Sequence, residues 1–362
     1  GRPASDLLVA APRAAGTVRL RYPRPMSLIS LLLALALEQW RPLGDRRAML
    51  RPLERYAAFL ERTFNAGEHQ HGIVAWVLAV VPIALAAWLL FVIAWRISPV
   101  LALAFNVGAL YLTVGFRQES HFFTDIHTAL KEGDLATARR VLGEWRGQSC
   151  DGLSASDVAR LTIESALAAA HRYVFGAIFW FVLLPGPSGA VLYRVSEYFA
   201  RRWSAPHAPD HVPDALGAEM GPPPPLTTVL VPGEPTRATE LARFGEFARQ
   251  AFHALDWIPV RVTAAAFAVV GDFEDAVYCW RTQASRWQDR LLGVVLAAGA
   301  GALGVRLGMP VIRNGTLEDR PELGLGDDAD TAFLDSTVGL VWRSLVLWLA
   351  MLLVIVVAGT VG

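Results

Sequence analysis

Three side chains that can carry charge share one predicted helix. Arg160 and Glu164 are four residues apart and His171 follows Glu164 by seven, so a helix brings all three to one side. In a helix exposed to water they would form a surface ion pair, which contributes little to stability. This helix instead leads into an apolar segment from Phe175, where an unpaired charge is costly and indicates function. We therefore interpret Arg160 and Glu164 as part of a site for an anionic ligand.

The start of this helix is predicted by its capping residues. Ser154 is followed three positions later by Asp157, which is the capping-box pattern and adds negative charge at a helix N-terminus. A helix is therefore expected to begin at Ser154 and to position the charged side chains downstream.

A proline- and glycine-rich break interrupts the apolar segment at residues 175–193. A complete crossing there would place the basic segments 117–172 and 194–257 on opposite sides of the membrane, against the positive-inside rule. We therefore expect a re-entrant segment that enters, breaks and returns, lining a cavity or buried in protein. The break and the residues after it supply further candidate ligand-binding positions: Pro185, Gly186, Gly189 and Tyr193.

The composition is that of a membrane protein. Hydrophobic residues make up 54% of the 362 residues, with 12 Trp and 17 Phe, and the mean hydropathy is +0.37. Such values exceed those of ordinary soluble domains. The formal net charge is zero, which argues against a nucleic-acid-binding surface. Cys150 and Cys279 have no metal-site or disulfide spacing, so we expect two inert packing residues.

The apolar segments predict an all-α, polytopic membrane protein with short or re-entrant helices and amphipathic cytoplasmic helices. Residues 73–95 form the clearest span, and 100–116 return to the same side as a hairpin. Residues 338–359 form the last strong span, whereas the run from Met26 to Trp40 is short for a crossing. Glu38 near its end is either an interfacial charge or an inward-facing site carboxylate.

Four regions divide the chain. Residues 1–25 are predicted to be a disordered extension, with translation starting at Met26, and 26–202 to be the first part of the membrane domain. Residues 203–237 hold nine of the 22 prolines and predict a flexible insertion, which is either a linker or a partner-docking segment. Residues 238–362 form the second part, with the C-terminal transmembrane helix.

Two histidine patterns have ordinary interpretations. His69 and His71 lack acidic or cysteine partners at helical spacing, so we expect a solvated loop rather than a metal site. His121 and Asp125 are four apart, and a hydrogen bond between them is expected.

Residues 41–72 carry six arginines on an amphipathic pattern that predicts an interfacial helix with its basic groups at lipid headgroups.

The second half of the chain adds more charged candidates. Arg261 lies in the apolar run 258–271, too short to cross, and is either a snorkelling residue or an inward anion ligand. The run 291–308 is rich in small residues that predict close helix packing, and it lacks the phosphate-loop signature. Three clustered acids give a weak prediction of a metal site, with a helix start as the alternative: Asp272, Glu274 and Asp275.

The order of short motifs IES, FWF, LPGPSGAVLY, FGEFA, DWIPVRVTA and GALGVRLG resembles the CobD/CbiB family of cobalamin-pathway membrane proteins and its relative AmpE, the membrane partner of a β-lactamase-regulating amidase. The resemblance covers roughly residues 27–359 and implies a multi-pass protein of the bacterial inner membrane. The cobalamin branch implies an ATP-dependent amidation that joins adenosylcobyric acid to aminopropanol or its phosphate. Mg²⁺ and ATP would then be the cofactors.

The chain departs from the synthase pattern at several acids. Glu164 and Ser165 match the pattern, but Ala168 and Ala169 follow where the family has acidic and amide side chains, and Glu197 replaces an expected Asn. This departure favours, as the first hypothesis, an AmpE-like sensor or accessory protein that has lost the synthase site. Glu164, Arg261 and Arg306 would line its cavity.

Two other hypotheses stay open. The second is an active adenosylcobinamide-phosphate synthase that uses relocated acids: Glu38, Glu164, Asp256 and Asp272. Glu164 would then be catalytic. The third is a transporter, favoured only by the broken helices. The expected partners are the lipid bilayer, an anionic or corrinoid small molecule and a membrane or cytoplasmic protein, without nucleic acid.

Overall fold

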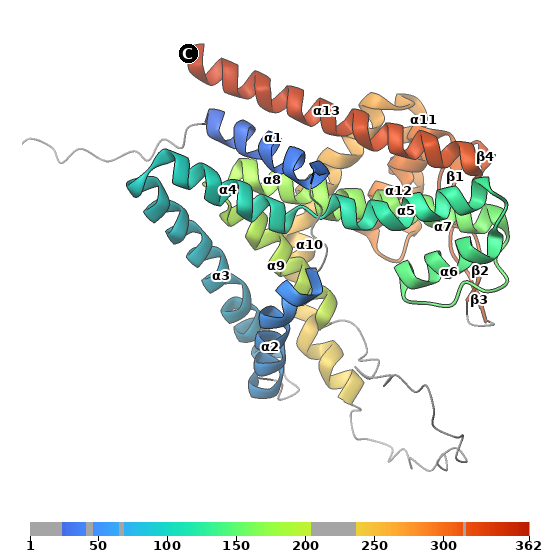
Figure 1. Ribbon diagram of the computed structural model, residues 1–362. Helices are drawn as coiled ribbons and strands as arrows, with labels where there is room; N and C mark the ends of the chain where they lie inside the picture. Colours follow the sequence, from blue (N-terminus) through green and yellow to red (C-terminus); the bar gives the residue numbers. More distant parts are fainter. Residues whose placement is uncertain (1–23, 41–45, 65–68, 204–236, 314–315, 362) are drawn as a thin grey trace, which may run out of the picture.

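The computed structural model describes residues 24–40, 46–64, 69–203, 237–313 and 316–361 (Figure 1). The described chain is almost entirely helical, which confirms the all-α prediction. In chain order the helices are α1 (Arg24–Trp40), α2 (Arg46–Phe64), α3 (His69–Ile97), α4 (Pro99–Thr113), α5 (Phe116–Lys131), α6 (Leu135–Arg146), α7 (Ala155–Ala170), the π-helix η1 (His171–Phe175), α8 (Gly176–Leu183), α9 (Ser188–Arg202), α10 (Arg237–Val270), α11 (Phe273–Gln283), the 3-10 helix η2 (Ala284–Arg286), α12 (Arg290–Leu303) and α13 (Thr331–Val361).

Four short strands lie between α12 and α13. β1 (Val305–Arg306) pairs in parallel with β4 (Asp327–Asp328), and β2 (Val311–Arg313) pairs antiparallel with β3 (Thr316–Glu318). These pairs fold the segment 304–328 back on itself. The segment therefore reaches the first turns of α7, which become part of the candidate site.

Four helices in the described part of the chain are long and apolar enough to cross a membrane: His71–Ile97, Ala155–Leu183, Phe244–Val270 and Thr331–Gly359. The first and last confirm the two strongest predicted spans. Ser98 caps α4 with its side chain directly after α3, as expected for the hairpin. The chain is thus a membrane protein whose bundle also includes shorter apolar helices.

One predicted segment was wrong in its length. We expected the apolar run 258–271 to be too short to cross, but α10 continues unbroken through Pro259, and its candidate span contains 27 residues. Proline is tolerated within transmembrane helices because neighbouring groups satisfy the freed backbone carbonyl. Asp256 and Arg261 consequently lie within a long helix rather than at the entrance of a short one.

Helices α7, η1 and α8 form one continuous helical segment, which we call the rod. The chain breaks after the rod and returns as α9 (Ser188–Arg202). The rod ends at Leu183, Gly186 adopts a φ of 66°, and α9 runs back against α8 (Figure 1). This is the predicted helix, break and return. Because Ala155–Leu183 is itself long enough to cross, whether the segment is re-entrant stays a prediction.

Gly189 allows this return to pack closely. A Cβ atom on Gly189 would lie 1.9 Å from the carbonyl oxygen of Trp180, so an alanine there must displace backbone. We expect Gly189→Ala to lower the free energy of unfolding by about 1 to 3 kcal/mol. The matched control is Gly108→Ala in α4, where a Cβ meets nothing within 4 Å. Thermal unfolding in detergent should separate the two, and equal melting temperatures would contradict this role for Gly189.

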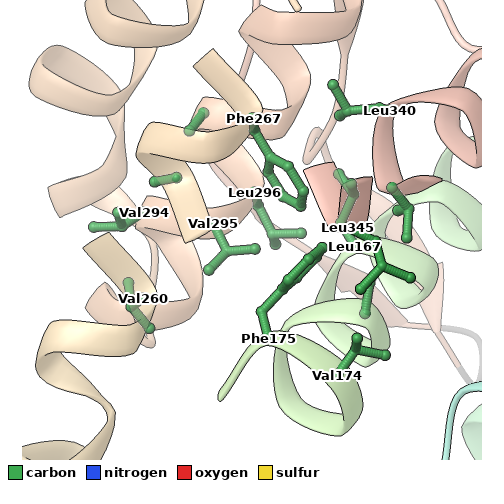
Figure 2. Packing of buried hydrophobic residues seen from close by; sticks show 14 of the residues in the cluster. Leu167, Val174, Phe175, Val260, Phe267, Val294, Val295, Leu296, Leu340 and Leu345 are labelled. Atoms are coloured by element: carbon green, nitrogen blue, oxygen red, sulfur yellow. The ribbon is translucent and has the colours of Figure 1, made fainter. Parts of the chain in front are cut away.

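The main hydrophobic core lies where the rod meets α10, α12 and α13. Phe175 packs edge-on against Phe267, and Leu167, Leu296 and Leu345 surround them (Figure 2). α12 is buried on nearly all sides because its small residues admit close neighbours, which confirms the predicted packing. This rigid core holds the charged face of α7 in place.

The amphipathic helix α2 buries part of its apolar side inside the protein. Ala57 and Leu60 share one buried cluster with residues of α3, α9 and α10, and the position of α2 at the membrane interface stays a prediction. His69 and His71 belong to the first turn of α3, so the predicted loop is wrong at these two positions. Most of the predicted extension, 1–25, and of the proline-rich insertion, 203–237, lies outside the described residues.

Candidate functional site

A capping box fixes the start of α7 and its charged side. The Ser154 hydroxyl accepts a hydrogen bond from the Asp157 backbone N–H at 3.1 Å, and the Asp157 carboxylate accepts one from the Ser154 N–H at 3.1 Å. The predicted motif is therefore confirmed. The second oxygen of Asp157 accepts a bond of 2.6 Å from Arg160. The cap thus also orients the first charged side chain of the site.

Glu164 is buried and joins α7 to the segment between α12 and α13. Its Oε1 accepts a hydrogen bond from the Gly308 N–H at 2.9 Å, and its Oε2 accepts one from Arg320 Nη1 at 2.8 Å. Arg320 also donates to the carbonyl oxygens of Gly308 and Met309, and its guanidinium lies over the ring of Trp287. The functional candidate Glu164 therefore has a partner, Arg320, that the sequence analysis missed.

A second buried polar cluster lies two helical turns further along the rod. His171 Nε2 lies 3.0 Å from Asp256 Oδ1, and His171 Nδ1 lies 2.9 Å from Thr263 Oγ1. Tyr193 donates its hydroxyl to the same Asp256 oxygen at 2.9 Å. All four residues are at most 4% exposed. The cluster joins the rod, α9 and α10, and it gives Tyr193, a predicted ligand-binding residue, a partner inside the protein.

Glu197 forms a third polar group on α9. It is 1% exposed and pairs with Arg194 at 3.0 Å and with Arg201 at 2.5 Å. Arg194 lies over the ring of Tyr173, and Arg201 donates to the Tyr173 hydroxyl. Tyr173 belongs to the π-helix, so this group adjoins the His171 cluster. Sequence reasoning noted Glu197 only as a departure from a motif.

Several other predicted residues lie apart from these clusters. Arg261 donates to the Trp257 carbonyl oxygen and lies 3.8 Å from the centroid of the Trp257 ring. Arg306 pairs with Asp328 at 2.9 Å, away from Glu164. The partners of Arg261 and Arg306 thus belong to the protein itself, and a single cavity lined by these two residues and Glu164 stays a prediction.

The proline- and glycine-rich break lies beside an apolar cavity. Pro185 lines a cavity of about 580 Å³ with residues of α1, α8, α10 and α13. Gly186 lies against the ring of Phe91, where a Cβ would be 2.6 Å from a ring carbon. The surroundings of Pro185 and Gly186 are therefore apolar, whereas the charged clusters lie along the rod.

The three clustered acids have a structural role. Asp272 caps α11 and accepts a hydrogen bond from the Asp275 N–H, and Glu274 lies in the same first turn. In the described part of the chain no group of three or more His, Cys, Asp or Glu side chains is placed to hold a metal ion. The helix-start alternative therefore accounts for Asp272, Glu274 and Asp275.

Two pairs of residues bear on smaller predictions. His121 Nδ1 lies 3.2 Å from Asp125, as expected for an exposed i, i+4 pair. Cys150 and Cys279 are buried and free. Burial, together with the nearby Asp275 carboxylate, raises the pKa of Cys279 to about 11, so this thiol is unreactive at neutral pH.

Comparison with known proteins places these clusters in a family. A model of the family described as CobD/Cbib protein matches residues 31–199 and 237–341, and the two parts contain Glu164, His171, Asp256 and Arg320. The chain belongs to the CobD/CbiB family. The match is interrupted at residues 200–236, where the proline-rich insertion was predicted.

Curated members of the CobD/CbiB family cover most of the chain. A protein of Stutzerimonas stutzeri named cobalamin biosynthesis protein CobD is 34% identical over 303 residues, which is 83% of this chain and 88% of that protein. A CobD of Chromobacterium violaceum is 33% identical over 77% of this chain and 78% of its own length. The CbiB protein of Salmonella typhimurium is 24% identical over 78% of this chain and 80% of its own. No solved structure gives a significant match.

Proposed function

We propose that this protein acts in cobalamin biosynthesis as an ATP-dependent amide-forming synthase that joins adenosylcobyric acid to aminopropanol or its phosphate. The observation that carries the proposal is the family relation over most of the chain, whose members are named for cobalamin biosynthesis. The reaction is the one that the resemblance implies. We further propose that it takes place at the bacterial inner membrane, in a multi-pass protein.

The burial of carboxylates removes our main argument against an enzyme. The sequence analysis favoured an AmpE-like sensor because most acids of the synthase pattern were absent. Four carboxylates are nevertheless buried within the described helices: Glu38, Glu164, Glu197 and Asp256. Ionisable side chains at such depth are costly and are kept for function by default. The names of the relatives also favour the synthase, so the regulatory alternative is no longer our first choice.

The charged clusters supply the two capacities that amide formation needs. The attacking amine must lose a proton, and a histidine that is hydrogen-bonded to a carboxylate can accept it. His171 and Asp256 form such a pair. The reaction also develops negative charge on phosphate and carboxyl oxygens, which arginine side chains stabilise. Arg160 lies four residues before Glu164 on α7, and one of its nitrogens has only the sulfur of Met309 as acceptor.

ATP would supply the activation of the carboxyl group, and Mg²⁺ would accompany it. A magnesium ion bound with a nucleotide needs only one or two protein carboxylates, because phosphate oxygens and water complete its shell. The described residues contain no ready-made group of three or more metal-ligating side chains. We therefore assign no metal ligands and derive no step through the ion.

The direct test is product formation by the purified, detergent-solubilised protein. Adenosylcobyric acid, aminopropanol phosphate and Mg²⁺–ATP are supplied, and the amide is detected by its mass. Omitting ATP should abolish the product, and Arg140→Gln, which alters an exposed ion pair on α6, should not change it. The Stutzerimonas stutzeri CobD protein can be assayed beside it. Product from the relative but none from this chain would refute the synthase and return the AmpE-like role to first place.

A further inference from the structure

Two arginines beside the start of the rod, Arg160 and the partly buried Arg320, differ in how many oxygen acceptors they have. Arg320 donates to three oxygen acceptors of different residues: the Glu164 carboxylate and the carbonyls of Gly308 and Met309. Arg160, 5% exposed, donates from one nitrogen to Asp157 and from a second to the sulfur of Met309 at 3.3 Å. Its Nε is buried and has no acceptor among the described residues.

This arrangement is energetically unfavourable for a guanidinium. A guanidinium carries five N–H donors and a fixed charge, whereas a thioether is only a weak acceptor. Buried donors are nearly always paired with oxygen, and one left unpaired requires an explanation. The sulfur of Met309 thus lies where an oxygen acceptor would be expected.

Met309 is held in a strained conformation at this position. Its φ is 65°, a left-handed value, and among the described residues no other residue apart from glycine has a positive φ. Such backbone conformations persist only where surrounding contacts impose them, and they cluster at ligand sites and switches. Here the contacts come from Glu164, which binds the Gly308 N–H, and from Arg320, which binds both carbonyls. These contacts therefore hold the backbone of Met309 in a conformation that places its thioether against Arg160.

We propose that Arg160 is the receptor for an oxyanion of a substrate, a phosphate or carboxylate group, and that Met309 occupies this position until the ligand displaces it. Arginine binds both kinds of oxyanion through parallel N–H···O bonds. Asp157, which bonds to Arg160, has a side chain that is 30% exposed, and Pro310, next to Met309 in the chain, is exposed, so the position lies near the protein surface. The inference rests on the proposed function for the identity of the substrate but not for the presence of the site.

The charges around Arg160 set limits on the ligand. Asp157 stays bonded to Arg160 Nη2 and also caps α7, so it repels a second anion on that side. Glu164 is neutralised by Arg320, whose own donors are in use. The ligand therefore takes the place of the Met309 sulfur at Nη1, which has no oxygen acceptor. One oxyanion group fits this requirement, and an extended polyanion does not.

The experiment measures binding without turnover. Inorganic phosphate, aminopropanol phosphate, ATP and acetate are each titrated into the wild-type protein in detergent at constant ionic strength. The apparent Kd is taken from the rise in melting temperature. Arg160→Gln should weaken binding of the recognised anion about 10- to 100-fold, the loss expected for charge-assisted hydrogen bonds. Met309→Gly should tighten it roughly 3- to 10-fold, because no thioether has to be displaced.

Arg140→Gln is the matched control, since it removes the same charge from an exposed pair on α6. It should bind the anion as the wild type does. If Arg160→Gln does not fold, Met309→Gly still tests the site. The proposal is overturned if none of the four anions binds, or if the Met309 variant binds them with unchanged affinity. Binding that depends on Arg160 in a protein that forms no amide would refute the synthase and leave the oxyanion site standing.

Discussion

Replacing Glu164 with alanine should lower the free energy of unfolding by about 3 to 5 kcal/mol, because Arg320 would remain buried without its carboxylate. The side chains of Glu164 and Arg320 are 5% and 11% exposed, so water replaces the lost partner poorly. The Gly308 N–H would lose its acceptor as well. Chemical denaturation in detergent micelles measures the change, and the same variant should form no amide in the synthase assay.

The exposed pair of Arg140 and Glu144 provides a matched control. Its side chains are 63% and 55% exposed, and Glu144→Ala should change stability by at most about 1 kcal/mol. A double variant, Glu164→Ala with Arg320→Ala, should be more stable than the sum of the single changes predicts, because it leaves no unpaired buried charge. Additive effects would argue that Glu164 and Arg320 do not depend on each other.

The second large effect is expected for Asp256→Asn, which should slow amide formation by about 10² to 10⁴ fold. A carboxylate can only accept hydrogen bonds, so it fixes which nitrogen of His171 carries a proton. An asparagine amide can also donate and no longer fixes the tautomer. The shape of the side chain is kept, so the protein should fold. The rate of product formation, measured across pH, reports the change.

Tyr193→Phe separates the charge pair from the rest of the cluster. It removes only the hydroxyl that donates to Asp256, and it should cost about 0.5 to 1.5 kcal/mol of stability with a small effect on rate. An Asp256→Asn protein that works at the wild-type rate would show that the His171 cluster is a structural one. A Tyr193→Phe protein that loses all activity would transfer the main role to the tyrosine.

Features that depend on residues close together in the chain could be predicted from the sequence. Ser154 and Asp157 lie within one turn, so the capping box could be recognised and was correct. The break at Gly186 follows from proline and glycine chemistry, and the return helix followed as predicted. The 73–95 span is long and uncharged, which made it unambiguous.

The partners of the charged residues could not be predicted from the sequence. Arg320 lies 156 positions from Glu164 in the chain, and nothing next to either residue indicates the other. Asp256 lies 85 positions from His171, and nothing local to either residue indicates the other. Pairing at this distance is decided by the packing of the rod against α10 and by the strands that fold back the segment 304–328.

For two arginines, the sequence could not predict whether a charged side chain in an apolar segment binds a ligand or another part of the protein. Arg261 was assigned an anion-binding alternative, but it lies over Trp257 of its own helix, an arrangement that needs no ligand. Arg306 was assigned to the cavity, but Asp328 on the neighbouring strand pairs with it. A charge in an apolar segment indicates that a partner exists, and only the fold decides whether that partner is a ligand or the protein itself.

The π-helix sets the angle between α7, which carries the charged side chains, and α8. The Gly176 N–H bonds to the His171 carbonyl oxygen five residues back, so this turn holds one residue more than an α-helical turn. Each residue of an α-helix rotates the chain by about 100°. Without the extra residue, α8 would be rotated by that angle relative to α7, and the Trp180 indole N–H could not bond to the Leu255 carbonyl oxygen while His171 faces Asp256. The inserted residue thus lets one polar side chain on each side of the π-helix bond to α10.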